Sequence, residues 1–311
     1  MIVSASRRTD LPAFHADWLC RRFSEGFVLV RNPYNARQVS RVSLAPDAVD
    51  GIVFWTKNPL PLAGRLSLFA PYPYYFQWTL TPYGRDLEPH LPEKSRLLAA
   101  FRELSERIGP LRLVWRYDPV LISPVWTAAR HGETFAAFCA ALAGACDTCV
   151  VSFLDRYRHR ESYFRALSLR PPNATEKEEL LASFQQSAAK YGFTLRACCE
   201  ADTGLPPAAC IDAARLEAIA GVPFARLRDR NQRPHCTCAA SVDIGAYNTC
   251  PGGCVYCYAV RAPRAVRPVS PDAPCLAGPV TAADIVTERP MPRLCRPAPA
   301  SLFSSDERNP S

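Results

Sequence analysis

Three cysteines late in the chain have the spacing of ligands to one metal cluster. They are Cys250, Cys254 and Cys257, in the order C-x3-C-x2-C. Three thiolates on one tight loop can each ligate a different iron of a [4Fe-4S] cubane, which leaves the fourth iron without a protein ligand. Gly252 and Gly253 suit a backbone that curves closely around a cluster, because glycine has no side chain to collide with it. The spacing therefore predicts a [4Fe-4S] cluster with one iron open to a substrate.

Two further cysteines precede this loop and leave other metal chemistry open. Cys236 and Cys238 form a C-x-C pair. Zinc bound by Cys236, Cys238, Cys254 and Cys257 is one alternative, although it leaves Cys250 unused. A closed iron-sulfur cluster with Cys236 or Cys238 as its fourth ligand is another. The pair is also a candidate for an edge of the cofactor site or for a separate redox-active pair.

Tyr256 adds an aromatic residue to the pattern, which then reads C-x3-C-x-aromatic-C and resembles the radical S-adenosylmethionine superfamily. The resemblance implies that the open iron binds the amino and carboxylate groups of S-adenosylmethionine, with Tyr256 near the adenine. It also implies that one electron from the cluster cleaves the sulfonium bond, and that a 5′-deoxyadenosyl radical then abstracts hydrogen from a substrate. An electron donor such as flavodoxin or ferredoxin is the partner that this chemistry requires. Superfamily members carry the loop after their first strand, whereas here it follows nearly all the predicted strands.

Over most of its length the chain also resembles the family named domain of unknown function 1848 (DUF1848). The segments that carry this resemblance are 4–10 (SASRRTD), 54–59 (FWTKNP) and 243–258. The family is described by a C-terminal cysteine cluster similar to that of radical enzymes. It implies no substrate, so peptides, nucleotides, tRNA and small metabolites all stay open.

Short apolar runs predict the strands that would position this chemistry. They cover residues 2–6, 27–31, 51–55, 74–79, 111–116, 148–153, 193–197 and 222–227. Segments with helical spacing lie between several of them, at 13–24, 93–108, 127–142, 156–167, 176–191 and 208–220. This alternation favours an α/β fold, namely a (β/α)8 TIM-like barrel, closed or distorted, over residues 1–230. A further strand at 38–44 is expected to form a hairpin with 27–31.

Two shorter segments follow the predicted barrel. Residues 231–260 form the cysteine-rich segment that holds the cluster loop. Residues 261–311 form a proline-rich tail, which is expected to wrap the surface or to stay partly disordered.

Polar residues follow most of the predicted strands, at the rim where barrels carry their active sites. The candidates for binding S-adenosylmethionine and substrate are Arg7, Arg8, Asp10, Lys57, Arg116, Asp118, Cys199 and Glu200. An arginine presents a bidentate fork to a carboxylate or phosphate, and burial perturbs the pKa of a lysine. The alternative for the charged residues is a structural ion pair, and for Cys199 it is burial as a small apolar group.

Composition bounds the location and the partners. Lysine and arginine total 37 against 29 aspartates and glutamates, for a formal net charge of +8 spread over the chain. Nucleic acid is an alternative partner on this count, and an ordinary solvated surface is the simpler explanation. No apolar run approaches the roughly 18 residues of a membrane helix, and the first residues lack a signal peptide, so we expect a cytoplasmic protein with reduced thiols and no membrane. A non-catalytic iron-sulfur or zinc protein that contacts nucleic acid or a protein partner is the alternative to an enzyme.

Overall fold

One parallel sheet forms the centre of the molecule. The computed structural model describes residues 1–229, 232–233, 235–261, 266 and 268–295. Seven strands pair in the order β8-β7-β6-β5-β4-β1-β9. Their bounds are β1 Ile2–Ala5, β4 Gly51–Thr56, β5 Tyr74–Thr79, β6 Leu113–Val120, β7 Thr148–Phe153, β8 Thr194–Ala197 and β9 Ser241–Asp243. Parallel registers such as Ile2 opposite Gly51 and Phe76 opposite Leu113 confirm the α/β prediction.

The sheet is open, so the prediction of a closed eight-stranded barrel is wrong. Two of the predicted barrel strands do not join the sheet. The run at 27–31 belongs to a second sheet, and the run at 222–227 makes an isolated bridge from Phe224 to Cys295 in place of a strand. The sheet gains one strand that was not predicted, β9, which lies in the cysteine-rich segment and pairs with β1. The sheet therefore ends at β8 on one side and at β9 on the other.

Helices cover one face of this sheet. They include α1 Leu11–Phe14, α2 Ala16–Glu25, α3 Leu60–Ala63, α4 Lys94–Ile108, α5 Ala128–Leu142 and α7 Ala174–Lys190, while α6 Glu161–Ala166 packs beyond the sheet. Short 3-10 turns lie at η1 Leu66–Phe69, η2 Pro110–Arg112 and η3 Arg158–Arg160. The ring of Trp115 stacks on Phe135 at 4.9 Å, and Phe135 stacks on Phe184 at 4.1 Å. These stacked rings join β6 to α5 and α5 to α7.

The other face is covered by α8 Ala213–Ala220 and by the chain around it. Alternate strand residues point to this side, including Ile2, Val53 and Val114, because successive side chains of a strand face opposite ways. They pack against residues between 208 and 239, and the hydroxyl of Tyr75 donates to the carbonyl of Cys210 at 2.7 Å. The interior of the predicted barrel is thus occupied by chain that follows β8.

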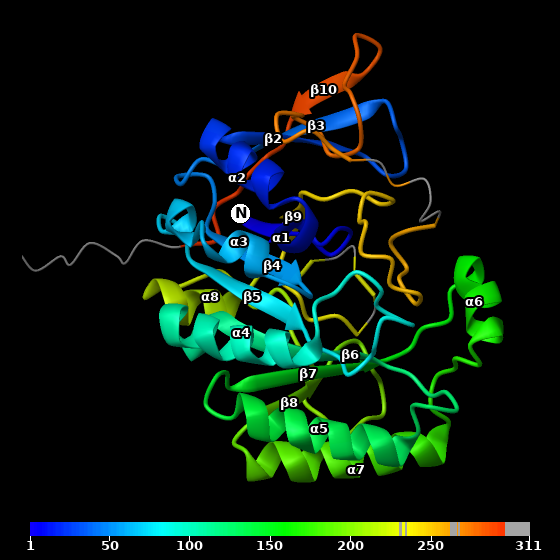
Figure 1. Cartoon of the computed structure of the whole chain (residues 1–311). Helices are drawn as coiled ribbons and strands as arrows, with labels where there is room; N and C mark the ends of the chain where they lie inside the picture. Colours follow the sequence, from blue (N-terminus) through cyan, green and yellow to red (C-terminus); the bar gives the residue numbers. More distant parts are fainter. Residues whose placement is uncertain (230–231, 234, 262–265, 267, 296–311) are drawn as a thin grey trace, which may run out of the picture.

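A smaller sheet stands beside the main one (Figure 1). Its strands are β2 Phe27–Arg31, β3 Gln38–Ser43 and β10 Ile285–Glu288, and the antiparallel pairing of β2 with β3 confirms the predicted hairpin. The tail between 268 and 295 contributes β10 and is tied to α2, where Trp18 Nε1 donates to the carbonyl of Ala273 at 2.7 Å. None of the helices in the described ranges combines the length and apolar character that a membrane span requires.

Candidate active site

Asp243 brings the cysteine-rich segment to the carboxyl end of β1. Its carboxylate accepts hydrogen bonds from Ser6 Oγ at 2.5 Å, from Ser4 Oγ at 2.9 Å and from the backbone N–H of Arg7 at 2.9 Å. Gly245 follows in close contact, because a Cβ there would lie 2.1 Å from Ser6 Oγ. The end of β9 and the end of β1 are therefore fixed together, and the chain enters the cysteine loop (residues 250–257) from this point.

The cysteine loop is held by the loops that follow other strands. Two carbonyls of the loop and the carbonyl just before it contact side chains from these other loops. His90 Nδ1 lies 2.8 Å from Pro251 O, and Arg160 Nε donates to Cys257 O at 2.8 Å. Before the loop, His15 Nε2 lies 3.0 Å from Thr249 O. The loop itself bends at Gly253, which has a φ of +69°. Glycine is favoured at this position because other residues adopt such a φ only with strain.

A cavity of about 560 Å³ lies between the cysteine loop and the strand ends. Cys250, Cys254 and Cys257 all line it. It is also lined by most of the residues that the sequence predicted, namely Arg7, Arg8, Asp10, Lys57, Arg116, Asp118, Cys199, Cys236, Cys238, Gly252 and Tyr256. Glu200 and Gly253 do not line it, and the Glu200 carboxylate instead accepts from the backbone N–H of Phe153 at 2.9 Å.

The chemistry of the loop fits thiolate ligands. Burial raises the pKa of the Cys250 thiol to about 12, while N–H groups of Asp10 and Gly252 favour its thiolate. Burial likewise raises the pKa of Cys254, against the positive charge of Lys57. The Sγ of Cys257 accepts from the backbone N–H of Ala259 at 3.4 Å. Buried sulfurs that meet N–H donors and a cation suit a metal that keeps them deprotonated.

As placed, no three or more His, Cys, Asp or Glu side chains in the described part of the chain form the ligand set of a metal ion. The assignment of a cluster to the loop therefore depends on the donor types and on the shared cavity. The loop cysteines also act on each other electrostatically. Burial contributes most to the raised pKa of Cys254, and Glu88, Cys257 and Cys250 raise it further.

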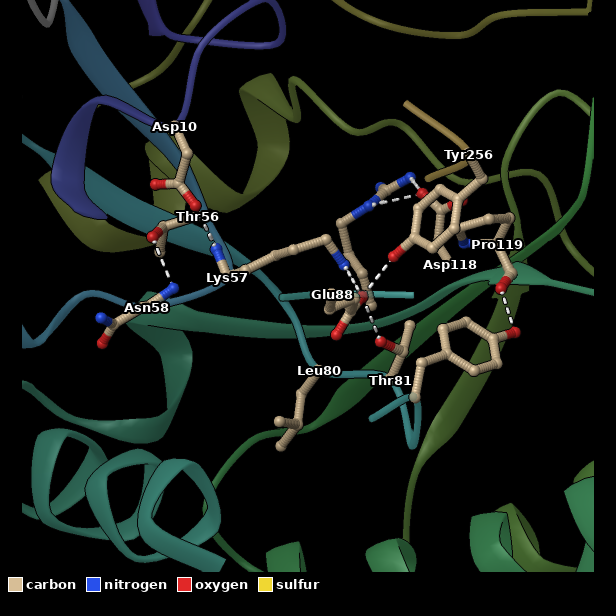
Figure 2. Close-up of polar contacts among 12 residues, drawn as sticks. Asp10, Thr56, Lys57, Asn58, Leu80, Thr81, Glu88, Asp118, Pro119 and Tyr256 are labelled. Atoms are coloured by element: carbon tan, nitrogen blue, oxygen red, sulfur yellow. Dashed lines mark hydrogen bonds and ion pairs between the residues drawn. The ribbon is translucent and has the colours of Figure 1, made fainter. Parts of the chain in front are cut away.

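Glu88 is the centre of the charge network on this cavity wall (Figure 2). Its fully buried carboxylate accepts from Lys57 Nζ at 2.7 Å, from Thr81 Oγ1 at 2.7 Å, from Lys94 Nζ at 2.5 Å and from the hydroxyl of Tyr256. Burial alone would raise the pKa of Glu88, but the charges of Lys57 and Lys94 outweigh it and lower the pKa to about 2. The network fixes Lys57 as a cation and Tyr256 as a donor directed away from solvent.

Lys57 also links this network to Asp10. Its backbone N–H donates to Asp10 Oδ2 at 2.7 Å (Figure 2). Burial lowers the pKa of the Lys57 ammonium, but the Glu88 charge next to it gives a net rise. The ammonium therefore stays charged at the cavity wall.

A second charged group comes from β6 and its neighbours. Arg116 binds Asp118 Oδ2 at 2.5 Å, and the hydroxyl of Ser152 donates to the other oxygen of Asp118. Two guanidinium groups lie near the Trp55 ring, that of Arg116 at 5.3 Å and that of Arg7 at 5.8 Å from the ring centroid. Trp55 Nε1 is buried and finds no acceptor among the described residues.

Sequence reasoning missed several residues of this site. Glu88 and Lys94 lie beyond the end of β5, further from the strand than the rule of polar strand ends reaches. Cys210 falls in the segment 208–220 with helical spacing and belongs to no ligand pattern in the sequence, yet it lines the cavity. Asp243 was noted only as part of a family segment, although an acid between a short apolar run and a glycine is a signal for a strand end.

One comparison with known proteins identifies a family. The model described as domain of unknown function (DUF1848) matches residues 2–259. No curated protein and no solved structure matches the chain. The matched residues include all seven strands of the main sheet and the cysteine loop.

Proposed function

Because the chain belongs to the DUF1848 family, whose description names no activity, we propose from the site itself that it is an iron-sulfur enzyme of the radical S-adenosylmethionine type. The observation that carries the proposal is the shared lining of one cavity. Three thiols on a single glycine-bent loop meet charged side chains from the ends of parallel strands there. Open parallel sheets bind their ligands at this end of the strands.

Cys250, Cys254 and Cys257 would hold a [4Fe-4S] cluster. When bound, the cluster would supply the electron that cleaves the sulfonium bond of S-adenosylmethionine. Three protein ligands leave one iron free for the amino and carboxylate groups of that molecule. A low-potential carrier such as flavodoxin or ferredoxin would deliver the electron.

The cavity side chains suit the rest of S-adenosylmethionine and a substrate. Lys57 presents a buried ammonium beside the loop, and Arg7 and Arg8 present guanidinium groups that suit a carboxylate or phosphate. Arg8 lies 5.1 Å from the ring of Tyr247, and Trp55 also lines the cavity. Aromatic faces with adjacent donors are what an adenosine group requires. The substrate class stays open.

The contacts of Cys236 and Cys238 favour this open site over the alternatives. Each of the two thiols acts on the pKa of the other, and Cys199 lies within reach of Cys236 as Cys210 does of Cys238. A zinc site shared with Cys254 and Cys257, or a cluster closed by Cys236 or Cys238, would need those thiols to leave these partners. The C-x-C pair therefore belongs to other chemistry than the loop.

The product 5′-deoxyadenosine tests the proposal. The protein is reconstituted anaerobically with iron and sulfide, reduced with dithionite in the presence of S-adenosylmethionine, and assayed by chromatography. We expect 5′-deoxyadenosine from the natural chain, at least tenfold less from Cys254→Ala, and an unchanged amount from Cys20→Ala, whose thiol lies on α2 away from the cavity. Absence of the product from fully loaded protein, or equal amounts from Cys254→Ala, would refute it.

A further inference from the structure

Five other cysteines meet in a second group on the lining of the same cavity. Three separate segments contribute them. Cys198 and Cys199 follow β8, Cys210 precedes α8, and Cys236 and Cys238 precede β9. The segments are far apart in sequence, so the fold alone brings these thiols together.

Four of these thiols lie close enough to act on one another. Cys198 Sγ lies 3.2 Å from Cys210 Sγ. The pKa of Cys210 responds to Cys198 and then to Cys238, and the pKa of Cys238 responds to Cys210 and then to Cys236, so the thiols lie in a run, within reach of one another in that order. Cys199 lies between the two ends of this run, because Cys198 and Cys236 both act on the pKa of its thiol. Its backbone has a left-handed φ of +55°.

Donors around the run suit sulfur that carries negative charge. Arg116 Nη1 donates to Cys210 Sγ at 2.8 Å, and the backbone N–H of Ile211 donates to Cys238 Sγ at 3.3 Å. Burial lowers the pKa of Arg7, but the charges of Asp243, Cys238 and Cys210 raise it. Arg7 therefore also lies near these two sulfurs. Asp118 already balances the charge of Arg116, and the further donation from Arg116 to Cys210 is of the kind that commonly holds metal-bound thiolates.

We propose that Cys198, Cys210, Cys236 and Cys238 form a second metal centre, a closed site of four thiolates separate from the Cys250 loop. Four sulfurs complete the tetrahedral shell of a zinc ion or the four corners of an iron-sulfur cubane, so no position is left for a substrate. Sulfurs on one zinc ion at about 2.3 Å are about 3.8 Å apart, so the pair at 3.2 Å would separate by about half an ångström on binding. A cubane needs a wider spread of sulfurs, and the 3.2 Å approach of Cys198 to Cys210 suits a single ion. The sulfurs of Cys236 and Cys238 would close on that ion when it binds, because the described residues hold no preassembled set of three or more ligands.

This centre would join the two edges that the open sheet leaves apart. Cys198 follows the edge strand β8, while Cys236 and Cys238 lie just before the opposite edge strand β9. Cys210 adds the chain that fills the face between them. A metal bound by all three segments stabilises the folded state against an unfolded chain that lacks the site. The inference does not rest on the radical enzyme proposal.

The test uses the full chain with the first loop disabled by Cys250→Ala, Cys254→Ala and Cys257→Ala. After anaerobic purification from medium with zinc and iron, we expect elemental analysis to find about one zinc, or about four irons with sulfide, per chain. Further Cys198→Ala and Cys210→Ala changes should remove that metal and lower the melting temperature, whereas Cys20→Ala should retain it. Cys20 is the matched control because its thiol lies on α2, away from the cavity.

Two results would overturn the inference. One is a loop-disabled chain without stoichiometric metal, and the other is metal that survives the loss of Cys198 and Cys210. If those last variants do not fold, X-ray absorption on the loop-disabled chain decides the matter, because four sulfur neighbours support the site and nitrogen or oxygen neighbours refute it. Metal retained here together with no 5′-deoxyadenosine from the natural chain would refute the enzyme proposal alone.

Discussion

Glu88→Gln is the change that tests the charge network most sharply. Glutamine keeps the size and one acceptor of Glu88 but removes the charge that Lys57 and Lys94 share. The pKa of Glu88 is lowered from 4.5 to about 2, and each unit corresponds to about 1.4 kcal/mol, so the ionised form contributes about 3 kcal/mol to folding. This agrees with the range of about 3 to 5 kcal/mol for breaking one side of a buried ion pair.

The sign of the pH dependence follows from the direction of the shift. A carboxyl group whose pKa is lowered in the folded state stabilises the protein above its unfolded pKa of 4.5 and loses that contribution as the pH falls toward 2. Urea unfolding should therefore show Glu88→Gln about 3 kcal/mol less stable at pH 7, with the difference narrowing below pH 4.5. Adding Lys57→Met should recover about 1 to 2 kcal/mol, because one of the two unpaired ammonium groups is then removed.

Glu93→Gln is the control, since Glu93 pairs with Arg85 at an exposed position where ion pairs contribute about 0 to 1 kcal/mol. The reasoning would be refuted if Glu88→Gln cost no more than Glu93→Gln. It would also be refuted if the cost were the same at pH 7 and pH 3.

Three further predictions concern the loop and its attachment. Asp243→Ala removes the acceptor of Ser4, Ser6 and the Arg7 N–H, and we expect a loss of about 2 kcal/mol in unfolding free energy together with less iron bound after reconstitution. Gly253→Ala places a Cβ 2.9 Å from Pro89 Cγ at a left-handed φ, so we expect urea unfolding to show a loss of about 1 to 2 kcal/mol in unfolding free energy. Gly64→Ala is the control, because Gly64 has open space and a φ of −69°, and it should not change the unfolding free energy measurably. Lys57→Met should raise the S-adenosylmethionine concentration for half-maximal 5′-deoxyadenosine formation about tenfold, and an unchanged value would show that Lys57 makes no contact with it.

The sequence predicted the sheet where local pattern decides structure. Runs such as 148–153 and 51–55 are apolar throughout because both faces of a parallel strand are buried, and both became strands. The strand β9 has only three residues, and its pairing with β1 depends on a contact across more than two hundred residues, which no local pattern reveals. The run at 222–227 is apolar, but among the described residues it makes only the isolated bridge from Phe224 to Cys295, and Leu227 at its end is 51 % exposed.

The candidate site divides in the same way. Arg7, Lys57 and Asp118 follow strands directly, so the rule of strand ends placed them on the cavity. Glu88 enters through a longer loop, and Cys210 enters through chain that fills the face of the sheet, so their positions depend on tertiary packing. The type and spacing of cysteines indicated metal chemistry, but only the fold separates them into a loop of three and a run of four.

The central claim is that the cysteine loop binds a [4Fe-4S] cluster through three irons and leaves the fourth iron without a protein ligand. Electron paramagnetic resonance of the reduced protein, recorded before and after S-adenosylmethionine is added, tests that claim most directly. We predict that the natural chain binds about four irons more than the loop-disabled chain, and that the spectrum of those irons changes when S-adenosylmethionine is added. Equal iron in the two chains, or a loop-bound cluster whose spectrum does not respond, would contradict it.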